Sequence, residues 1–147
     1  MTDKGSIGKA EIRTLVPHSG TMCLLDEVTQ WDDRVITCAA NTHRDTANPL
    51  RRDGRLSAVH AFEYGAQAAA VHGGLRARSV GASALPGYLA ALRDAHLYAA
   101  RLDDITSPLQ ICANRLFGDS ANTIYECRIS ANGVLLANAR ITIIQRV

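Results

Sequence analysis

The sequence predicts a single α+β domain in which a long helix packs against an antiparallel sheet. Positions 61–70 are almost entirely small and apolar, as expected of a buried helix. The C-terminal part of the chain alternates apolar and polar residues, as strands with one buried face do. With 147 residues, the chain is long enough to bury the core of one domain but not of two. We therefore expect one domain over residues 1–147.

The elements expected before the central helix are short. Positions 7–15 favour an amphipathic helix. Strands are expected at 22–31 and 34–42, and the acidic pair between them favours a tight turn, so that the two form a hairpin. Residues 44–56 are too polar, and too interrupted by proline and glycine, for a regular element. They predict a loop that leads into the helix.

The central helix is expected from about Ser57 to about Val71. The pair Gly73-Gly74 follows, and glycine is the residue best suited to a left-handed helix cap. The glycine and alanine residues along this helix let other backbone approach closely. A sheet that curves around a helix requires such an approach.

The segments after the helix predict further strands. Alternation favours strands at 109–117, 123–130 and 134–145, and Asn132-Gly133 favours a two-residue hairpin turn between the last two. The segment 87–102 is different, because its many Ala and Leu residues favour a helix by propensity alone.

Composition and charge exclude several classes of protein. Charged residues make up 20% of the chain and hydrophobic residues 47%, an ordinary composition for a soluble protein. The net charge is only +2, and no basic stripe alternates with aromatic residues, so no nucleic-acid partner is expected. No apolar run has the length of a signal peptide core or a membrane span. We therefore expect a cytoplasmic protein with no membrane partner.

The cysteines and histidines show no metal-binding pattern. The four cysteines are far apart and form no Cys-x-x-Cys pair, and no glycine-rich nucleotide motif is present. We therefore expect neither a metal nor a cofactor. Core positions are expected for all four cysteines: Cys23, Cys38, Cys112 and Cys127.

Two motifs carry a resemblance to a known family. The first is Pro17-His18 followed by Leu24-Leu25-Asp26, and the second is Glu63-Tyr64-Gly65-Ala66-Gln67 on the central helix. Together they resemble the β-hydroxyacyl-acyl-carrier-protein dehydratases of the hot-dog fold, and in particular an atypical bacterial subgroup associated with aryl-polyene and related polyketide-like pathways. The resemblance implies a sheet wrapped around the central helix. It also implies that 87–102 is a strand, in spite of its helical propensity.

Between the two motifs, the chain departs from the family. The family's usual His-Phe-Pro-Gly and second Pro-Gly are replaced by His43-Arg44-Asp45 and by a loop that ends at Asp53-Gly54-Arg55. His43 lies 20 positions before Glu63, which is more than the usual spacing. The loop is therefore expected to be longer than the family's loop or differently folded. The resemblance does not define the carbonyl-binding site or the acyl pocket.

The resemblance also implies roles for individual residues. Elimination of water from a β-hydroxyacyl thioester needs a base for the proton beside the carbonyl, an acid for the departing hydroxyl, and donors for the enolate-like oxygen. By position, His43 becomes the base and Glu63 the acid. The expected substrate-binding groups are the backbone amides of Leu56, Ser57 and Ala58 at the helix start, and the side chain of Gln67, which orients Glu63.

His60 is the alternative base. It lies three positions before Glu63, so the two side chains share one face of the helix and can pair without help from the loop. Glutamate is rarely buried unless it is paired or functional. A functional role is therefore favoured for Glu63 with either histidine.

Three functions remain open at this point. The first is dehydration of a β-hydroxyacyl group on acyl carrier protein, in fatty-acid or polyketide-type synthesis, with the basic cluster Arg51, Arg52 and Arg55 docking the acidic carrier. The second is thioester hydrolysis by a helical carboxylate that activates water. The third is a non-catalytic subunit that binds acyl chains or completes a heteromeric partner. We also expect a homodimer, with higher assembly left open, because a twofold partner would cover exposed sheet edges.

Overall fold

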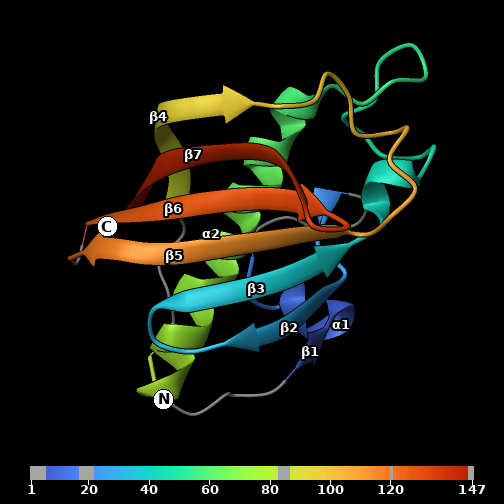
Figure 1. The fold of residues 1–147 in the computed structure, drawn as a ribbon. Helices are drawn as coiled ribbons and strands as arrows, with labels where there is room; N and C mark the ends of the chain where they lie inside the picture. The colour runs from blue at the N-terminus through green and yellow to red at the C-terminus, as the bar shows by residue number, and fades with distance from the viewer. Residues whose placement is uncertain (1–5, 17–21, 83–86, 120, 146–147) are drawn as a thin grey trace.

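The computed structural model describes residues 6–16, 22–82, 87–119 and 121–145. They form a seven-stranded antiparallel sheet with the order β1-β2-β3-β5-β6-β7-β4, and one long helix (Figure 1). The strands are β1 (Ile7–Gly8), β2 (Glu27–Trp31), β3 (Val35–Ala40), β4 (Gly87–Leu97), β5 (Leu109–Gly118), β6 (Asn122–Ala131) and β7 (Val134–Gln145). The helices are α1 (Lys9–Ile12), α2 (Ala61–Ser79) and the 3₁₀ turns η2 (Thr42–Arg44) and η3 (Ala58–His60).

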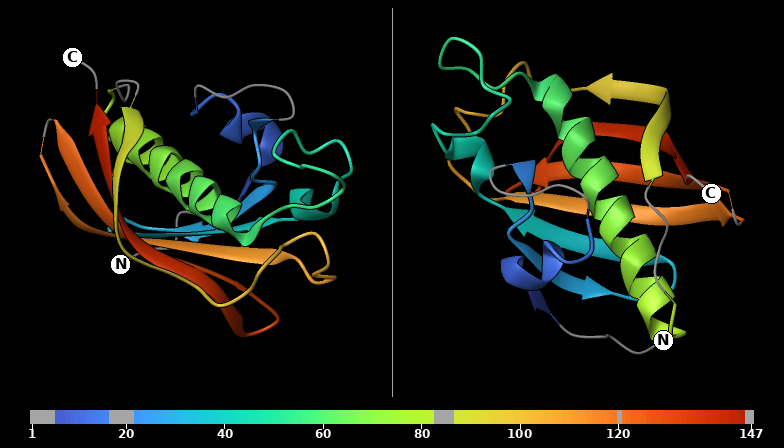
Figure 2. Two further views of the ribbon diagram at one scale, coloured as in Figure 1. Left: turned by 90° about the horizontal axis from the view of Figure 1, so that it is seen from above. Right: turned by 180° about the vertical axis from the view of Figure 1, so that it is seen from behind.

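Helix α2 lies in the concave face of the curved sheet, as the left view in Figure 2 shows, and it crosses the strands in the right view. Small residues allow this close packing. A Cβ atom added at Gly65 would lie 3.1 Å from Cys127 Cβ of β6, and one added at Gly74 would lie 3.1 Å from the side chain of Leu15. The expected α+β architecture, a sheet wrapped around one helix, is confirmed.

The expected end of the helix at Gly73-Gly74 is wrong. Helix α2 continues to Ser79. Gly81 follows its end with a left-handed φ of +74°, and the Ala82 N–H donates to Ala77 O at 2.8 Å. A glycine inside a helix costs about 1 kcal/mol relative to alanine. Burial of Leu75 beyond the pair, together with the contact at Gly74, outweighs that cost.

The N-terminal elements are shorter than expected because side chains hold the backbone in irregular conformations. The Lys9 ammonium donates to Asp26 Oδ1 at 3.0 Å and to the carbonyls of Cys23 and Leu25. Asp26 Oδ2 accepts from the Asn41 N–H at 2.7 Å. Asp26 of the first motif therefore joins α1 to the ends of β2 and β3. The other half of that motif, Pro17-His18, lies outside the described residues.

The C-terminal strands confirm the alternation, with one shift. Tyr125, Cys127 and Ile129 of β6 are buried, as expected. The register between β6 and β7 shifts after Ile129, so that Leu136 of β7 is buried. Cys112 is only half-buried, unlike the other three cysteines, and the expectation of a core position for it is wrong.

A buried histidine that no motif indicated fastens α2 to the sheet. The Nε2–H of His72 donates to Asp32 O at 2.6 Å, so Nδ1 carries the lone pair that accepts from the Tyr125 hydroxyl, also at 2.6 Å. Burial is the main cause that lowers the pKa of His72, which favours this neutral form. The contact connects the second half of α2 to the β2–β3 turn and to β6.

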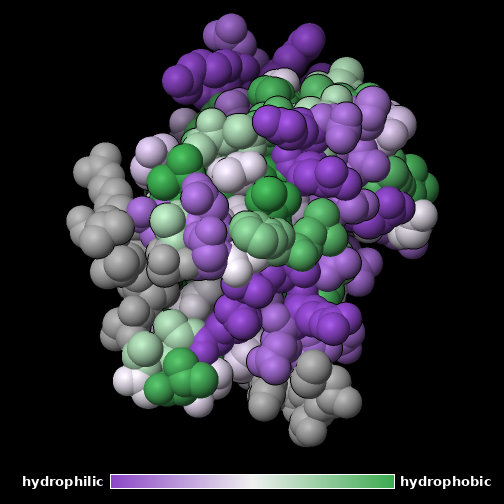
Figure 3. Space-filling view, turned by 90° about the vertical axis from the view of Figure 1, so that its left-hand side faces the viewer, coloured by the Kyte–Doolittle hydropathy of each residue, from purple (hydrophilic) through white to green (hydrophobic). Residues whose placement is uncertain are grey.

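Strand β4 forms one edge of the sheet, where it pairs with β7 (Figure 1). It is a strand, as the resemblance implied, and not a helix. The register shifts between Arg93 and His96, and Asp94 there has a φ of +50°, which marks a bulge. Tyr88, Leu92 and Leu97 lie exposed along this edge. On the side of the molecule with the β5–β6 connection, by contrast, exposed hydrophobic residues form small patches among hydrophilic ones (Figure 3).

Candidate active site

Glu63 lies half-buried in the first turn of α2, and Gln67 holds it from one turn further on. The Gln67 amide nitrogen donates to Glu63 Oε1 at 3.2 Å and to Met22 O at 2.8 Å, while its oxygen accepts from the Leu24 N–H at 2.9 Å. Gln67 is only 2% exposed, so its amide has little freedom to turn. It connects the two sequence motifs, and its contact with Glu63 is the one expected of an orienting residue.

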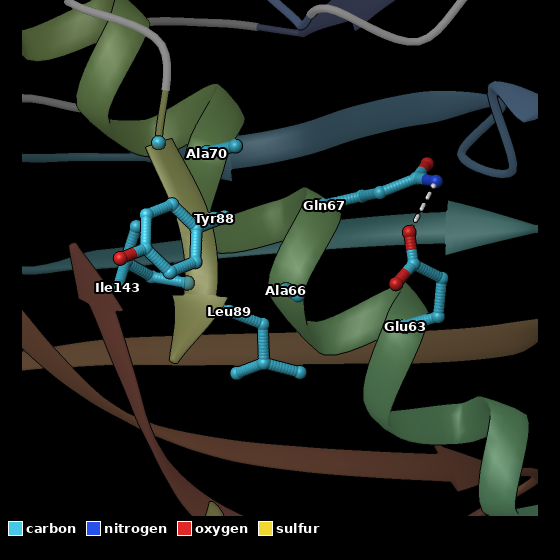
Figure 4. Close-up of a pocket in the computed structure, with 8 residues that line it drawn as sticks. Glu63, Ala66, Gln67, Ala70, Tyr88, Leu89 and Ile143 are labelled. Atoms are coloured by element: carbon cyan, nitrogen blue, oxygen red, sulfur yellow. Dashed lines mark hydrogen bonds between the residues drawn. The ribbon is translucent and has the colours of Figure 1, made fainter. Parts of the chain in front are cut away.

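A cavity of about 370 Å³ opens beside Glu63, between α2 and strands β4 and β7 (Figure 4). The Glu63–Gln67 pair lies at one end and Tyr88 and Ile143 at the other. Apart from the polar pair, the lining is mostly small and apolar. The lining residues are Glu63, Ala66, Gln67, Ala70, Gly87, Tyr88, Leu89 and Ile143.

His43 lies in η2, fully buried. Its Nε2 lies 3.1 Å from both Ile105 O and Ser107 O, and because carbonyls only accept, Nε2 carries the proton and donates it to both. Nδ1 then carries the lone pair, and it makes no hydrogen bond within the part of the chain that the structure describes. Burial is the main cause that lowers the pKa of His43, so the neutral, proton-accepting form is favoured.

His60 lies close enough to Glu63 in the same chain to sense its charge. It is half-buried at the end of η3, immediately before α2. Burial and the Arg52 cation lower its pKa, while the Glu63 charge raises it. His43, in contrast, senses the charges of Arg44 and Arg51. The pairing of His43 with the Glu63 of a partner subunit, which the family resemblance implies, stays a prediction.

A polar network that the sequence did not indicate connects η2, which holds His43, to the first turn of α2, which holds Glu63. The Asn48 side-chain amide donates to the Tyr64 hydroxyl at 3.3 Å, the hydroxyl donates to Thr42 Oγ1 at 2.8 Å, and Thr42 donates to Leu24 O at 2.7 Å. Tyr64 and Thr42 are the neighbours of Glu63 and His43. A tyrosine inside an apolar helix was the available signal, because a buried hydroxyl needs a partner.

The segment after β4 holds the start of the helix and changes the expected carbonyl-binding site. The Leu56 N–H donates to Asp103 Oδ1 at 2.8 Å, and the Ala58 N–H donates to Ala100 O at 3.0 Å. Both amides are thus engaged within the chain, and the expectation that they bind a substrate carbonyl is wrong. Arg101 and the Leu56 N–H also hold the pKa of the Asp103 carboxyl well below its usual range, which keeps this anchor ionised.

The basic cluster divides into inward- and outward-facing residues. Arg52 and Arg55 are exposed, as a docking role requires. Arg51 is half-buried, and its guanidinium is engaged by three backbone carbonyls of its own loop. The expectation that Arg51 docks a carrier protein is therefore not supported by its geometry.

No group of three or more His, Cys, Asp or Glu side chains among the described residues could hold a metal ion. No described helix is long and apolar enough to cross a membrane.

Two structures of low sequence identity share the fold. A homologue of HP0420 from Helicobacter felis is 10% identical, with a TM-score of 0.61 and coverage of 88% of this chain and 82% of that chain. A hypothetical thioesterase with coenzyme A from Streptococcus pneumoniae is 16% identical, with a TM-score of 0.56 and coverage of 82% and 87%. At these identities the similarity shows the fold alone.

Greater similarity is found to dehydratases. The dehydratase heterocomplex ApeI:P from Xenorhabdus doucetiae is 27% identical, with a TM-score of 0.84 and coverage of 92% of this chain and 91% of that chain. No curated protein matches the chain. A family model described as ApeP dehydratase, of the ApeP-like group, matches residues 10–147. Because that match covers nearly the whole length and includes both motifs, the chain belongs to the ApeP-like dehydratase family.

Proposed function

We propose that the chain dehydrates a β-hydroxyacyl thioester, carried on acyl carrier protein, to the trans-2-enoyl thioester. The observation that carries this proposal is the apolar cavity of about 370 Å³ with the carboxyl group of Glu63 at one end. Such a cavity suits an acyl chain, and a carboxyl at its end suits proton transfer at the reacting carbons. Membership of the ApeP-like dehydratase family supports a hydro-lyase. The pathway we infer is synthesis of the fatty-acid or aryl-polyene type.

In the proposed reaction, His43 Nδ1 takes the proton from the carbon beside the thioester carbonyl. The electron pair of that C–H bond forms the new C=C bond, and Glu63 gives its proton to the β-hydroxyl, which leaves as water. The carbonyl oxygen, which gains charge in the transition state, needs a donor. With the other two amides engaged, we assign this role to the Ser57 N–H at the start of the helix.

The product distinguishes dehydration from thioester hydrolysis. Incubation with a β-hydroxyacyl carrier-protein substrate should yield the conjugated enoyl thioester, detected by its ultraviolet absorbance and by the loss of one water in the carrier's mass. Release of free thiol without enoyl product would favour the thioesterase. Neither product, with substrate still bound, would favour the non-catalytic subunit.

We further propose that β4 pairs with a second copy of the chain. β4 is an edge strand of 11 residues, and an unpaired edge with exposed apolar side chains is prone to pair with another strand. A twofold partner would cover the same surface on both subunits. Three residues of β4 line the cavity, so the acyl site would then lie at the interface.

The chain is therefore expected to be a dimer by light scattering at micromolar concentration. Leu92→Lys should weaken the dimer, because it puts a charge on the edge, whereas Val134→Lys at the exposed β6–β7 turn serves as the matched control. A monomer would count against the homodimer. If the chain gained mass only with a different dehydratase chain, it would instead form a heterocomplex, as the Xenorhabdus protein does.

Arg52 and Arg55 are exposed beside the start of the helix, where they suit an acidic carrier protein. The four cysteines are free thiols, which supports a reducing compartment and hence a cytoplasmic location.

A further inference from the structure

Arg51 differs from the other arginines of the loop because its half-buried guanidinium donates to three backbone carbonyls. Its Nε donates to Asp45 O at 2.9 Å, its Nη1 to Gly54 O at 3.0 Å and its Nη2 to His43 O at 3.3 Å. The planar guanidinium presents its donors in a fixed fork, so one side chain holds three carbonyls in a defined arrangement.

The three carbonyls come from the beginning and the end of one loop. His43 and Asp45 lie at its start, and Gly54 lies at its end, in a left-handed turn between Arg52 and Arg55. This is the loop that replaces the family's His-Phe-Pro-Gly and second Pro-Gly. Without those turns, the backbone needs other contacts to offset the entropy lost on ordering. Arg51 supplies three of them.

We propose that Arg51 is a positioning residue for His43 and that it does not dock the carrier protein. The proposal rests on the proposed function, since it takes His43 as the base. Arg51 holds the His43 carbonyl from one side, while Ile105 and Ser107 hold the ring Nε2–H from the other. The backbone and the ring of His43 are thus both fixed, which leaves Nδ1 in one orientation.

The positive charge of Arg51 also favours the neutral, proton-accepting form of His43. Burial is the largest cause that lowers the pKa of His43, and the Arg44 and Arg51 cations lower it further, against its two backbone hydrogen bonds. A neutral imidazole is the form that accepts a proton. The carboxylates on the segment packed against the ring are those of Asp103 and Asp104, and both face Arg101.

The test compares three variants on two substrates, the β-hydroxyacyl thioester of acyl carrier protein and that of N-acetylcysteamine. Arg51→Gln should lower kcat by about 10-fold to 10²-fold on both, because a displaced base costs turnover whatever the carrier. KM for the carrier protein should stay the same. Arg51→Lys keeps the charge but loses the fork, so kcat should fall similarly.

The pH profile separates geometry from charge. The acid limb of kcat/KM should move to higher pH in Arg51→Gln, because a cation that lowers the pKa of His43 is gone, and stay in place in Arg51→Lys. Arg44→Gln is the matched control. It removes a neighbouring cation that makes only one contact, to Thr106 O at 3.3 Å. Arg44→Gln should move the acid limb of kcat/KM to higher pH and leave the maximal kcat unchanged.

Three results would overturn the proposal. A raised KM for the carrier protein, with normal turnover of the N-acetylcysteamine thioester by Arg51→Gln, would assign Arg51 to docking. Parental kcat in both Arg51 variants, with His43→Ala inactive, would overturn the role of Arg51 while sparing the base. If His43→Ala is fully active, the proposed base is wrong and the role of Arg51 fails with it. Should Arg51→Gln not fold, Arg51→Lys still tests the positioning role, because it keeps the charge and loses the fork: parental kcat in Arg51→Lys would overturn that role.

Discussion

Glu63→Gln is expected to lower the turnover of a β-hydroxyacyl carrier-protein substrate by about 10²-fold to 10⁴-fold. The substitution keeps the shape of the side chain but removes the titrating proton, so the departing hydroxyl has no acid. The carboxamide oxygen can still accept from the Gln67 amide, which lies 3.2 Å from Glu63 Oε1. The cavity should therefore keep its form. The initial rate of enoyl formation at saturating substrate measures the effect.

Two controls make the result specific. Glu27→Gln makes the same chemical change at an exposed position on β2 and should leave the rate unchanged. The melting temperature of Glu63→Gln should stay close to that of the parent. Unchanged turnover in Glu63→Gln would end the assignment of Glu63 as the acid.

His43→Ala is expected to abolish dehydration, while His60→Ala keeps it. A base must reach the proton that it removes, and two histidines cannot both occupy that place beside one carboxylate. Nδ1 of His43 carries a lone pair without a hydrogen bond among the described residues, and the ring is held in one tautomer. The rates of enoyl formation by both variants decide the question.

The structure also keeps His60 as a candidate for the base. His60 lies near Glu63 in the same chain, whereas His43 is fully buried and its ring is held by the segment after β4. Loss of activity in His60→Ala, with His43→Ala active, would assign the base to His60. Because His43→Ala leaves a cavity in a buried site, His43→Gln is the second variant, since its amide can still donate toward the two carbonyls.

Mixing inactive subunits tests whether His43 acts across the interface. In a dimer of one His43→Ala subunit and one Glu63→Gln subunit, one site would hold both changes and the other neither. Random exchange should then restore about a quarter of the parental activity, since half of the dimers are mixed and each has one intact site of two. A pair of residues within one subunit would give no recovery. If each single variant dehydrates as well as the parent, neither His43 nor Glu63 is required and the chemistry lies elsewhere.

Periodicity along the chain determined the fold class without further information. Tyr125, Cys127 and Ile129 alternate with polar residues, and they are buried where the alternation predicts. This works because side-chain direction in a strand is a local property with a period of two. The strand at β4 is different, because its Ala and Leu residues favour a helix and only the family resemblance predicted it.

The length of α2 was decided by tertiary contacts. Gly73-Gly74 is a local signal for a helix end, yet Leu75 and the contact of Gly74 with Leu15 lie in the core of the folded chain. Leu15 and Gly74 are distant in sequence, so no local pattern contains this contact. Local propensity is weak compared with such burial, and the helix continues to Ser79.

In the candidate site, too, some features follow from local sequence and others depend on the folded chain. The motif Glu63-Tyr64-Gly65-Ala66-Gln67 was sufficient to predict a glutamate with Gln67 beside it, because residues four apart share a helix face. The partners of His43, the engaged Leu56 and Ala58 amides and the inward turn of Arg51 were visible only in the folded chain. His43 meets Ile105 and Ser107 across 62 and 64 positions. Which ring nitrogen holds the proton depends on those distant carbonyls, and residue spacing carries no information about them.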